Sequence, residues 1–180
     1  QEAARRGLPN LKDTVSAVAR YSDPEVMETF LRHGVLSERE LLARQEILME
    51  NYIRAVHVEI KLSQVMGRTM ILPVGMQWAQ QAAGMAQAAR ILAEGEEHPE
   101  VGYYKEVRSH VAGLMTALNA LDRSHEEVDA MEGMLPRAEA ARDKLLPLMA
   151  ECRTHADALE GMVDDALWPL PKYNEMLWQL

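Results

Sequence analysis

The sequence predicts an all-α protein, an elongated antiparallel bundle of about three long helices. Apolar residues recur at helical spacing over long stretches of the chain. The 12 Met residues suit helix packing, because Met fills irregular gaps between helices. Hydrophobic residues make up 48% of the 180 residues, which excludes disorder, and the single Phe argues against a β-sandwich.

The N-terminal segment, residues 1–36, predicts short helices that connect to the bundle. Residues 1–6 favour a helix, and Gly7 stands where a helix end accepts a left-handed residue. Because no initiator Met precedes this helix, we expect the chain to be a fragment of a larger protein. Asn10 is the predicted N-cap of a second helix, which spans residues 11–20.

A third short helix is predicted to begin at Asp23-Pro24, with Asp23 as its cap and Pro24 in the first helical position. Its end is expected at His33-Gly34. We expect this helix to bury four apolar side chains: Val26, Met27, Phe30 and Leu31.

The first long helix is predicted from Ser37 to about Glu94. Ser37 and Glu40 have the spacing of a capping box, in which each side chain bonds to the backbone amide of the other. Pro73 lacks a backbone donor, so we expect a kink near it. The predicted apolar face comprises Leu41, Leu48, Tyr52, Val56, Ile60, Met66, Met70 and Val74.

Two further long helices are predicted to complete the bundle, which spans residues 37–165. The acidic segment 94–100 is interpreted as an exposed loop, and the second helix follows it over residues 101–135, with a possible internal break at Ser124. The third begins at Pro136, and Pro147 is expected to bend it. The predicted apolar faces are Tyr104, Val107, Val111, Leu114, Met115, Leu118, Leu121, Val128, Met131 and Leu135 on the second helix, and Leu145, Leu146, Met149, Cys152, Leu159 and Met162 on the third.

The last segment, residues 166–180, is a proline-rich strap that cannot continue a helix. So dense an apolar segment is rarely left in water. We therefore expect it to pack back over the helices or against a partner surface. The predicted interface residues are Trp168, Pro169, Leu170, Pro171, Tyr173, Leu177 and Trp178.

Charge and cysteine content exclude several classes of protein. The net charge of −9, without a dense basic stripe, argues against nucleic-acid binding. No apolar run approaches the ~20 residues that cross a bilayer, so no membrane association is expected. The single cysteine, Cys152, excludes an internal disulfide framework and favours a cytoplasmic location.

No catalytic constellation is recognisable within the 180 residues. Cys152 and His155 are three residues apart, but we interpret Cys152 as a buried core residue rather than a nucleophile. The Met residues at 66, 70 and 76 are interpreted as packing rather than a cofactor site. We assign no catalytic, cofactor-binding or metal-binding residue to this chain.

The histidines raise the question of a metal site, because imidazole is a common metal ligand. Three pairs have helical spacing: Glu106 with His110, Glu151 with His155, and Asp122 with His125. Repeated Glu-x-x-His motifs, which build metal sites in bundles, are absent, so we interpret these pairs as contacts on helix surfaces. His57 with Glu59 is interpreted as a satisfied, partly buried pair rather than a ligand set.

Several motifs in order resemble the C-terminal part of type III glutamine synthetase. The resemblance covers nearly the whole chain and is carried by Arg6–Leu11 (RGLPNL), Phe30–Leu41 (FLRHGVLSEREL), Arg44–Ile47, Glu50–Tyr52, Ile71–Pro73 (ILP), Trp168–Tyr173 (WPLPKY) and Met176–Trp178. The sequence departs from the family pattern at Trp178, where Phe is usual, and at residues 56–60.

The resemblance implies a parent enzyme that condenses glutamate with ammonia through γ-glutamyl phosphate, using ATP and Mg²⁺ or Mn²⁺. Its catalytic residues would lie upstream, leaving this chain as a non-catalytic domain that braces the catalytic domain or a ring of subunits. Two alternatives stay open: a free-standing helical interaction or scaffold module, and a bundle that binds a small ligand or metal. An effector site between the helices is a further possible use.

Overall fold

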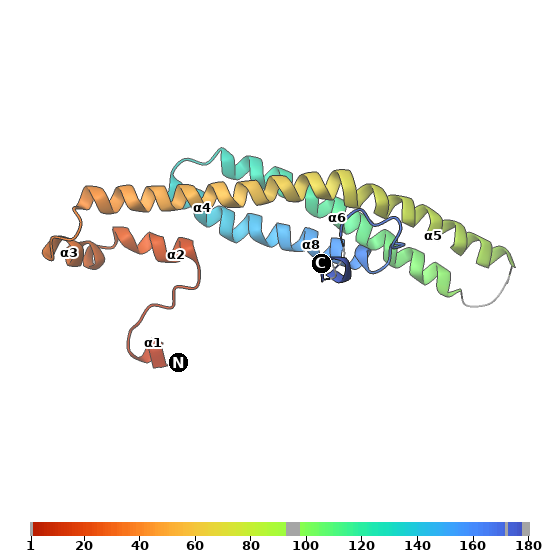
Figure 1. Ribbon diagram of the computed structural model, residues 1–180, viewed down its shortest axis with the longest axis horizontal. Coiled ribbons are helices and arrows are strands. Elements are labelled where there is room, and N and C mark those ends of the chain that lie inside the picture. Colours follow the sequence, from red (N-terminus) through yellow and green to blue (C-terminus); the bar gives the residue numbers. More distant parts are fainter. Residues whose placement is uncertain (1, 93–97, 172, 178–180) are drawn as a thin grey trace. The chain divides into compact units, whose positions relative to one another are not determined.

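The computed structural model describes residues 2–92, 98–171 and 173–177, and within these ranges it contains helices and no strand (Figure 1). The predicted all-α class is therefore confirmed. The elements are α1 (Glu2–Arg5), α2 (Thr14–Ala19), the 3₁₀ turn η1 (Arg20–Ser22), α3 (Pro24–Arg32), α4 (Glu38–Met66), the π-helical turn η2 (Gly67–Ile71), α5 (Leu72–Leu92), α6 (Pro99–Asp129), α7 (Met134–Ala140), the π-helical turn η3 (Ala141–Leu145), α8 (Leu146–Glu160) and α9 (Tyr173–Leu177).

The chain divides into two compact units that share the long helices. The first comprises Gln1–Glu59 and His125–Leu146, and the second comprises Ile60–Ser124 and Pro147–Leu180. Helices α4 and α6 therefore contribute residues to both. The predicted division into residues 1–36, 37–165 and 166–180 stays a prediction.

The first unit packs α2 and α7 against α4. Its core contains Val15, Val18, Met49, Ile53 and Ala138, with Tyr52 and Leu135 against them. Asp13, rather than the predicted Asn10, is the N-cap of α2: its carboxylate accepts from the Ser16 amide at 2.8 Å. Arg142, which is distant in sequence, donates to Asp13 at 3.3 Å and supports this choice of cap.

Local signals predicted two helix boundaries in the first unit correctly. The Ser37–Glu40 capping box forms, with the Ser37 amide 2.8 Å from Glu40 Oε2 and the Glu40 amide 3.4 Å from Ser37 Oγ. Helix α3 ends at Arg32, and Gly34 (φ 62°) follows its C-cap His33; the Val35 amide bonds to the Phe30 carbonyl as in a Schellman motif.

The predicted burial of α3 is wrong. None of its residues is buried, and Leu31 is 46% exposed, because no other element of the first unit covers its apolar side fully. The same correction applies to Leu48 on α4, which is 38% exposed, whereas Leu41, Val56 and Ile60 are buried as predicted.

The second unit packs α5, α6 and α8 around a continuous apolar core. Leu114, Leu118, Leu121 and Leu159 are at most 1% exposed. A methyl group added at Gly67 would lie 2.9 Å from Leu118 Cδ2. This glycine therefore lets the α4–η2 junction approach α6 closely.

Pro73 and Pro147 each follow a π-helical turn. In η2 the Leu72 amide bonds to the Gly67 carbonyl, five residues back, and Pro73 comes next. In η3 the Leu146 amide bonds to the Ala141 carbonyl in the same way, and Pro147 follows. A proline clashes with the carbonyl four residues before it, and the wider turn relieves this clash while the helix continues.

The second long helix ends earlier than predicted. Helix α6 stops at Asp129 rather than Leu135, and it runs through Ser124 without the possible break. Gly133 has a φ of 85°, a left-handed conformation that lets the chain turn before α7 begins at Met134 rather than Pro136. The predicted end of the first long helix at Glu94-Gly95 lies outside the described residues.

Candidate functional site

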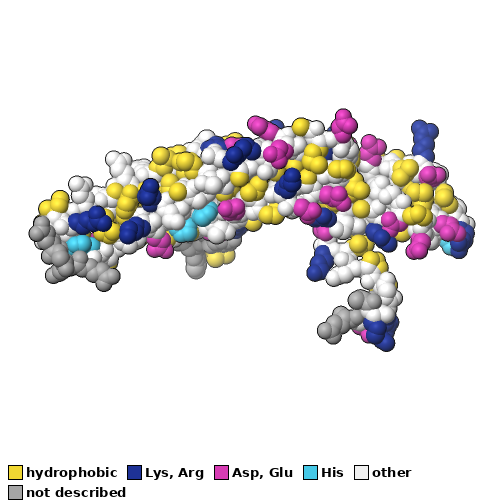
Figure 2. All heavy atoms as spheres, turned by 180° about the vertical axis from the view of Figure 1, so that it is seen from behind, with side chains coloured by type: hydrophobic (Ala, Val, Ile, Leu, Met, Phe, Trp, Pro, Cys, Tyr) yellow, Lys and Arg dark blue, Asp and Glu magenta, His cyan; other side chains and the backbone are white. Residues whose placement is uncertain are grey.

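Exposed apolar side chains occur in both units, and Figure 2 shows hydrophobic side chains between charged ones on one face of the molecule. Leu8, Val35 and Ile47 are each more than half exposed. Ile47 also lines a shallow pocket on α4 together with Tyr21 and Leu48.

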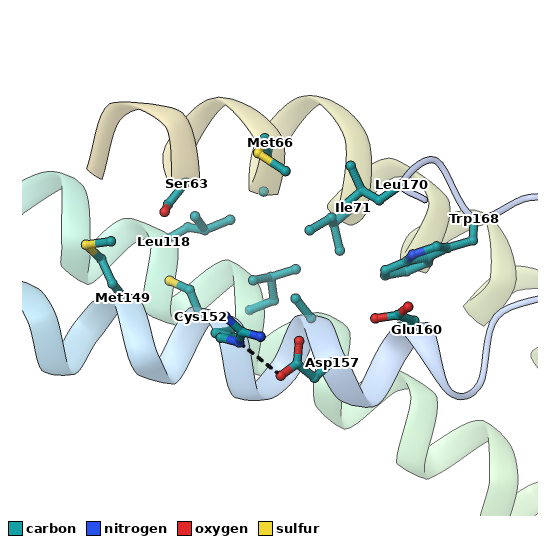
Figure 3. Close-up of a pocket in the computed structure, with 14 residues that line it drawn as sticks. Ser63, Met66, Ile71, Leu118, Met149, Cys152, Asp157, Glu160, Trp168 and Leu170 are labelled. Carbon is teal, nitrogen blue, oxygen red and sulfur yellow. Dashed lines mark hydrogen bonds and ion pairs between the residues drawn. The ribbon is translucent and has the colours of Figure 1, made fainter. Parts of the chain in front are cut away.

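A second feature is an apolar groove in the second unit that the C-terminal strap partly covers (Figure 3). Trp168 and Leu170 of the strap line it, and Met66 and Leu118 lie on the facing helices. The groove holds about 280 Å³, below the roughly 300–1,000 Å³ of most ligand pockets. It therefore suits the strap's own side chains better than a small-molecule ligand.

The strap is positioned by hydrogen bonds that turn the chain after α8. The Leu167 amide bonds to the Asp164 carbonyl at 2.9 Å, and the Trp168 amide bonds to the same carbonyl at 3.2 Å. Nearby, the Trp78 indole donates to Tyr103 Oη at 2.8 Å, and the Tyr103 hydroxyl donates to the Met162 carbonyl at 2.7 Å. These bonds tie α5, α6 and the segment after α8 together.

The predicted interface residues of the strap divide into two groups. Trp168, Pro169 and Leu170 are half-buried, whereas Pro171 is exposed and Leu177 is 78% exposed. The side chain of Tyr173 and the whole of Trp178 lie outside the described residues. An interface role for these residues stays a prediction.

Cys152 also lines this groove and is 6% exposed, so its interpretation as a core residue is confirmed. Burial raises the pKa of the Cys152 thiol to about 11. Such a thiol is almost fully protonated near neutral pH, which is the opposite of what a nucleophilic cysteine requires.

The predicted carboxylate–histidine pairs have other partners. His110 Nδ1 lies 3.2 Å from His155 Nδ1, which joins α6 to α8. Asp122 accepts a hydrogen bond from Gln64 at 2.8 Å and pairs with Arg68. Residues of all three predicted pairs therefore take part in contacts between helices.

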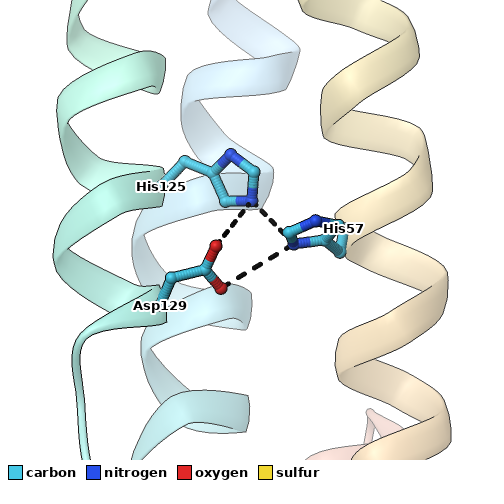
Figure 4. A group of neighbouring side chains, drawn as sticks. All are labelled: His57, His125 and Asp129. Carbon is cyan, nitrogen blue, oxygen red and sulfur yellow. Dashed lines mark hydrogen bonds and ion pairs between the residues drawn. The ribbon is translucent and has the colours of Figure 1, made fainter.

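A three-residue cluster forms in the first unit where α4 meets the last turn of α6 (Figure 4). His57 Nδ1 lies 2.8 Å from His125 Nε2, and Asp129 Oδ1 lies 3.7 Å from His57 Nδ1. Sequence reasoning paired His57 with Glu59 and His125 with Asp122, and so missed Asp129. The signal was available, because His125 and Asp129 are four residues apart and share one face of a helix.

None of the described helices combines the length and apolar character that a membrane span requires.

Comparison with known proteins yields one family and a consistent set of relatives. The family model described as "Glutamine synthetase C-terminal domain" matches residues 1–90, half of the chain. The chain is 29% identical over 181 residues to a glutamine synthetase of Butyrivibrio fibrisolvens, a match that covers 100% of this chain and 26% of the relative. It is 28% identical to a glutamine synthetase of Bacteroides fragilis (strain YCH46), covering 99% of this chain and 25% of the relative.

A third relative, the type-3 glutamine synthetase of Dictyostelium discoideum, is 27% identical over 98% of this chain and 25% of its own length. The chain thus spans about a quarter of the length of the curated relatives it matches.

Proposed function

Because the chain belongs to the family of glutamine synthetase C-terminal domains, we propose that it is a non-catalytic helical domain that braces the catalytic part of a glutamine synthetase. The parent enzyme would condense glutamate with ammonia at the expense of ATP, and its ATP and Mg²⁺ or Mn²⁺ would bind upstream of these residues. The enzyme would be cytoplasmic and assemble as a homo-oligomeric ring.

The observation that carries this proposal is that the apolar side chains of α3 and of nearby residues are not buried within the first unit. Helix α3 has no buried residue although its apolar side chains share one side. Leu31 is 46% exposed, Val35 62% and Ile47 56%. Burying apolar surface contributes roughly 25 cal/mol per Å², so a partner surface that covers these side chains would be held firmly.

The position of this surface in the sequence supports the catalytic domain as its partner. It is built from the first 60 residues, and an upstream catalytic domain would join the chain next to them. We therefore assign the first unit to the contact with the catalytic domain, of the same subunit or of a neighbour in the ring.

The test uses the full-length enzyme with one exposed side chain changed at a time. Ile47→Lys places a charge on the proposed contact surface, whereas Leu62→Lys makes the same change on α4 in the second unit, at a side chain that is 57% exposed. We expect Ile47→Lys to lower the native mass and the γ-glutamyl transfer activity, and Leu62→Lys to leave both unchanged.

The two variants also separate the parts of the proposal. If neither variant alters assembly or activity, and deletion of all residues after Gly7 also leaves both unchanged, the bracing role is wrong. If Leu62→Lys alone disrupts assembly, the domain braces through its second unit and the assignment to the first is wrong. Far-UV circular dichroism of each variant checks that the helices remain folded.

A further inference from the structure

The cluster of His57, His125 and Asp129 has the composition of a metal site, and it stands independently of the proposed function. His57 comes from α4, and His125 and Asp129 come from the last turn of α6. Their ligand atoms all lie within 4.8 Å of one another, and Figure 4 shows the three side chains converging. The two helices are thus joined by side chains that each offer a metal-binding atom.

The separations of these atoms match the edges of a coordination tetrahedron. The His57–His125 distance is 2.8 Å, and Asp129 oxygens lie 3.6 Å from His125 Nε2 and 3.7 Å from His57 Nδ1. Metal–ligand bonds of about 2.0–2.1 Å in a tetrahedron place neighbouring ligands roughly 3.3–3.4 Å apart. The observed values lie on both sides of this distance and within about 0.6 Å of it.

A metal ion would replace the short hydrogen bond between the two imidazoles. At 2.8 Å one ring nitrogen donates its hydrogen and the other accepts it. When a metal binds, the donating ring carries its proton on its other nitrogen, and both facing lone pairs become ligands. Two neutral histidines can therefore bind the ion without a net loss of protons.

The charges around the cluster favour the binding of a cation with moderate affinity. Asp129 is the last residue of α6, so the negative end of the helix dipole lies beside the cluster. Arg137 donates to Asp129 Oδ1 at 3.0 Å, which orients the carboxylate but partly neutralises it. Asp129 and His57 also line a pocket on α4, so water can reach a fourth coordination position.

We propose that His57, His125 and Asp129 bind a divalent transition-metal ion, with Zn²⁺ as the best match. Two imidazoles and one carboxylate suit Zn²⁺ and its neighbours in the first row, whereas Mg²⁺ prefers an all-oxygen shell. The ion fastens the end of α6 to the middle of α4 in the first unit. Its role is to fix this junction, with the fourth position held by water.

The experiment measures Zn²⁺ binding to the full-length protein by equilibrium dialysis in excess Mg²⁺, which occupies sites that prefer oxygen ligands. Wild type is compared with His57→Asn and His125→Asn, which keep side chains of similar size and polarity. We expect each variant to bind one Zn²⁺ fewer per chain, or to bind it at least tenfold more weakly. Replacing Zn²⁺ by Co²⁺ should give the visible absorption of a tetrahedral site in wild type only.

Two control variants separate this site from other histidines. His33→Asn changes an exposed histidine of the same unit, and His110→Asn breaks the histidine pair of the second unit. Both should bind Zn²⁺ as wild type does. Equal Zn²⁺ binding by wild type and the His57 and His125 variants would overturn the proposal, as would a loss confined to His110→Asn. Circular dichroism without metal confirms that each variant is folded, and a second substitution, Asp129→Asn, replaces any that is not.

Discussion

Gly113→Ala tests the closest packing in the second unit. A methyl group at this position would lie 2.3 Å from His155 Cε1 and 2.4 Å from its Nε2. Atoms cannot approach this closely, so the half-buried His155 ring must leave its place beside His110. The substitution therefore changes how α6 meets α8.

The expected cost follows from two destabilising terms and one stabilising term. Overpacking of a filled site costs about 1–3 kcal/mol, and losing the His110–His155 contact costs about 0.5–1.5 kcal/mol. Replacing Gly by Ala inside a helix returns about 0.8–1.0 kcal/mol. We expect Gly113→Ala to lower the free energy of unfolding by about 1–2 kcal/mol.

Gly84→Ala is the matched control. Gly84 also lies inside a helix of the second unit, and a methyl group there meets no atom within 4 Å. We expect this variant to gain about 0.5–1 kcal/mol from helix propensity alone. The free energies of unfolding of the two variants then differ by roughly 1.5–3 kcal/mol, and Tm shifts of about 2–4 °C per kcal/mol make this difference measurable.

Urea and thermal unfolding followed by Trp fluorescence provide the assay. All three Trp residues of the chain belong to sequence segments of the second unit, so the signal reports on the unit that is changed. The double variant Gly113→Ala/His155→Ala completes the cycle, because Gly113→Ala should become stabilising once the ring is gone. If Gly113→Ala proves as stable as Gly84→Ala, the packing argument is refuted.

Two further predictions concern the strap and the N-cap of α2. Trp168→Ala should speed the alkylation of Cys152 at pH 8 several-fold by opening the groove, whereas Pro171→Ala should leave the rate unchanged. In wild type the alkylation rate should keep rising from pH 9 to 11, because the pKa of the thiol is about 11. An alkylation rate that levels off near pH 9 would contradict this. The Ser16 amide, with help from Arg142, lowers the pKa of Asp13, so its stabilising contribution is complete above the ordinary carboxyl pKa and is lost as the pH falls through the lowered value. In wild type, amide protection in α2 should fall as the pH is lowered, and Asp13→Asn should reduce this pH dependence, as measured by hydrogen exchange. A pH profile that is unchanged in the variant would refute this role of Asp13.

Sequence signals that act within a few residues predicted the local structure well. The Ser37–Glu40 capping box and the turn at His33-Gly34 that closes α3 both form, because each depends on hydrogen bonds between neighbouring residues. The N-cap of α2 was misplaced at Asn10, and Arg142, which supports the observed cap Asp13, lies far along the chain. Burial of α3 was overestimated because helical periodicity shows which side is apolar, but not whether another element covers it.

The candidate metal cluster shows where prediction from one sequence stops. His125 and Asp129 lie one turn apart, so their common face was predictable. His57 is 68 residues from His125, and their contact depends on the register between α4 and α6. That register follows from core packing along both helices, which no local pattern encodes.

Pro73 and Trp168 are far apart in the sequence, and the fold connects them. Pro73 requires relief from a clash with the preceding turn, and η2 provides it as a wider π-helical turn. Two residues of η2, Gly67 and Ile71, line the groove into which Trp168 of the strap fits. Because Gly67 has no side chain, Leu118 of α6 packs directly against the turn at this edge of the groove. The proline and the strap are therefore parts of one arrangement, in which the strap closes the groove beside the turn.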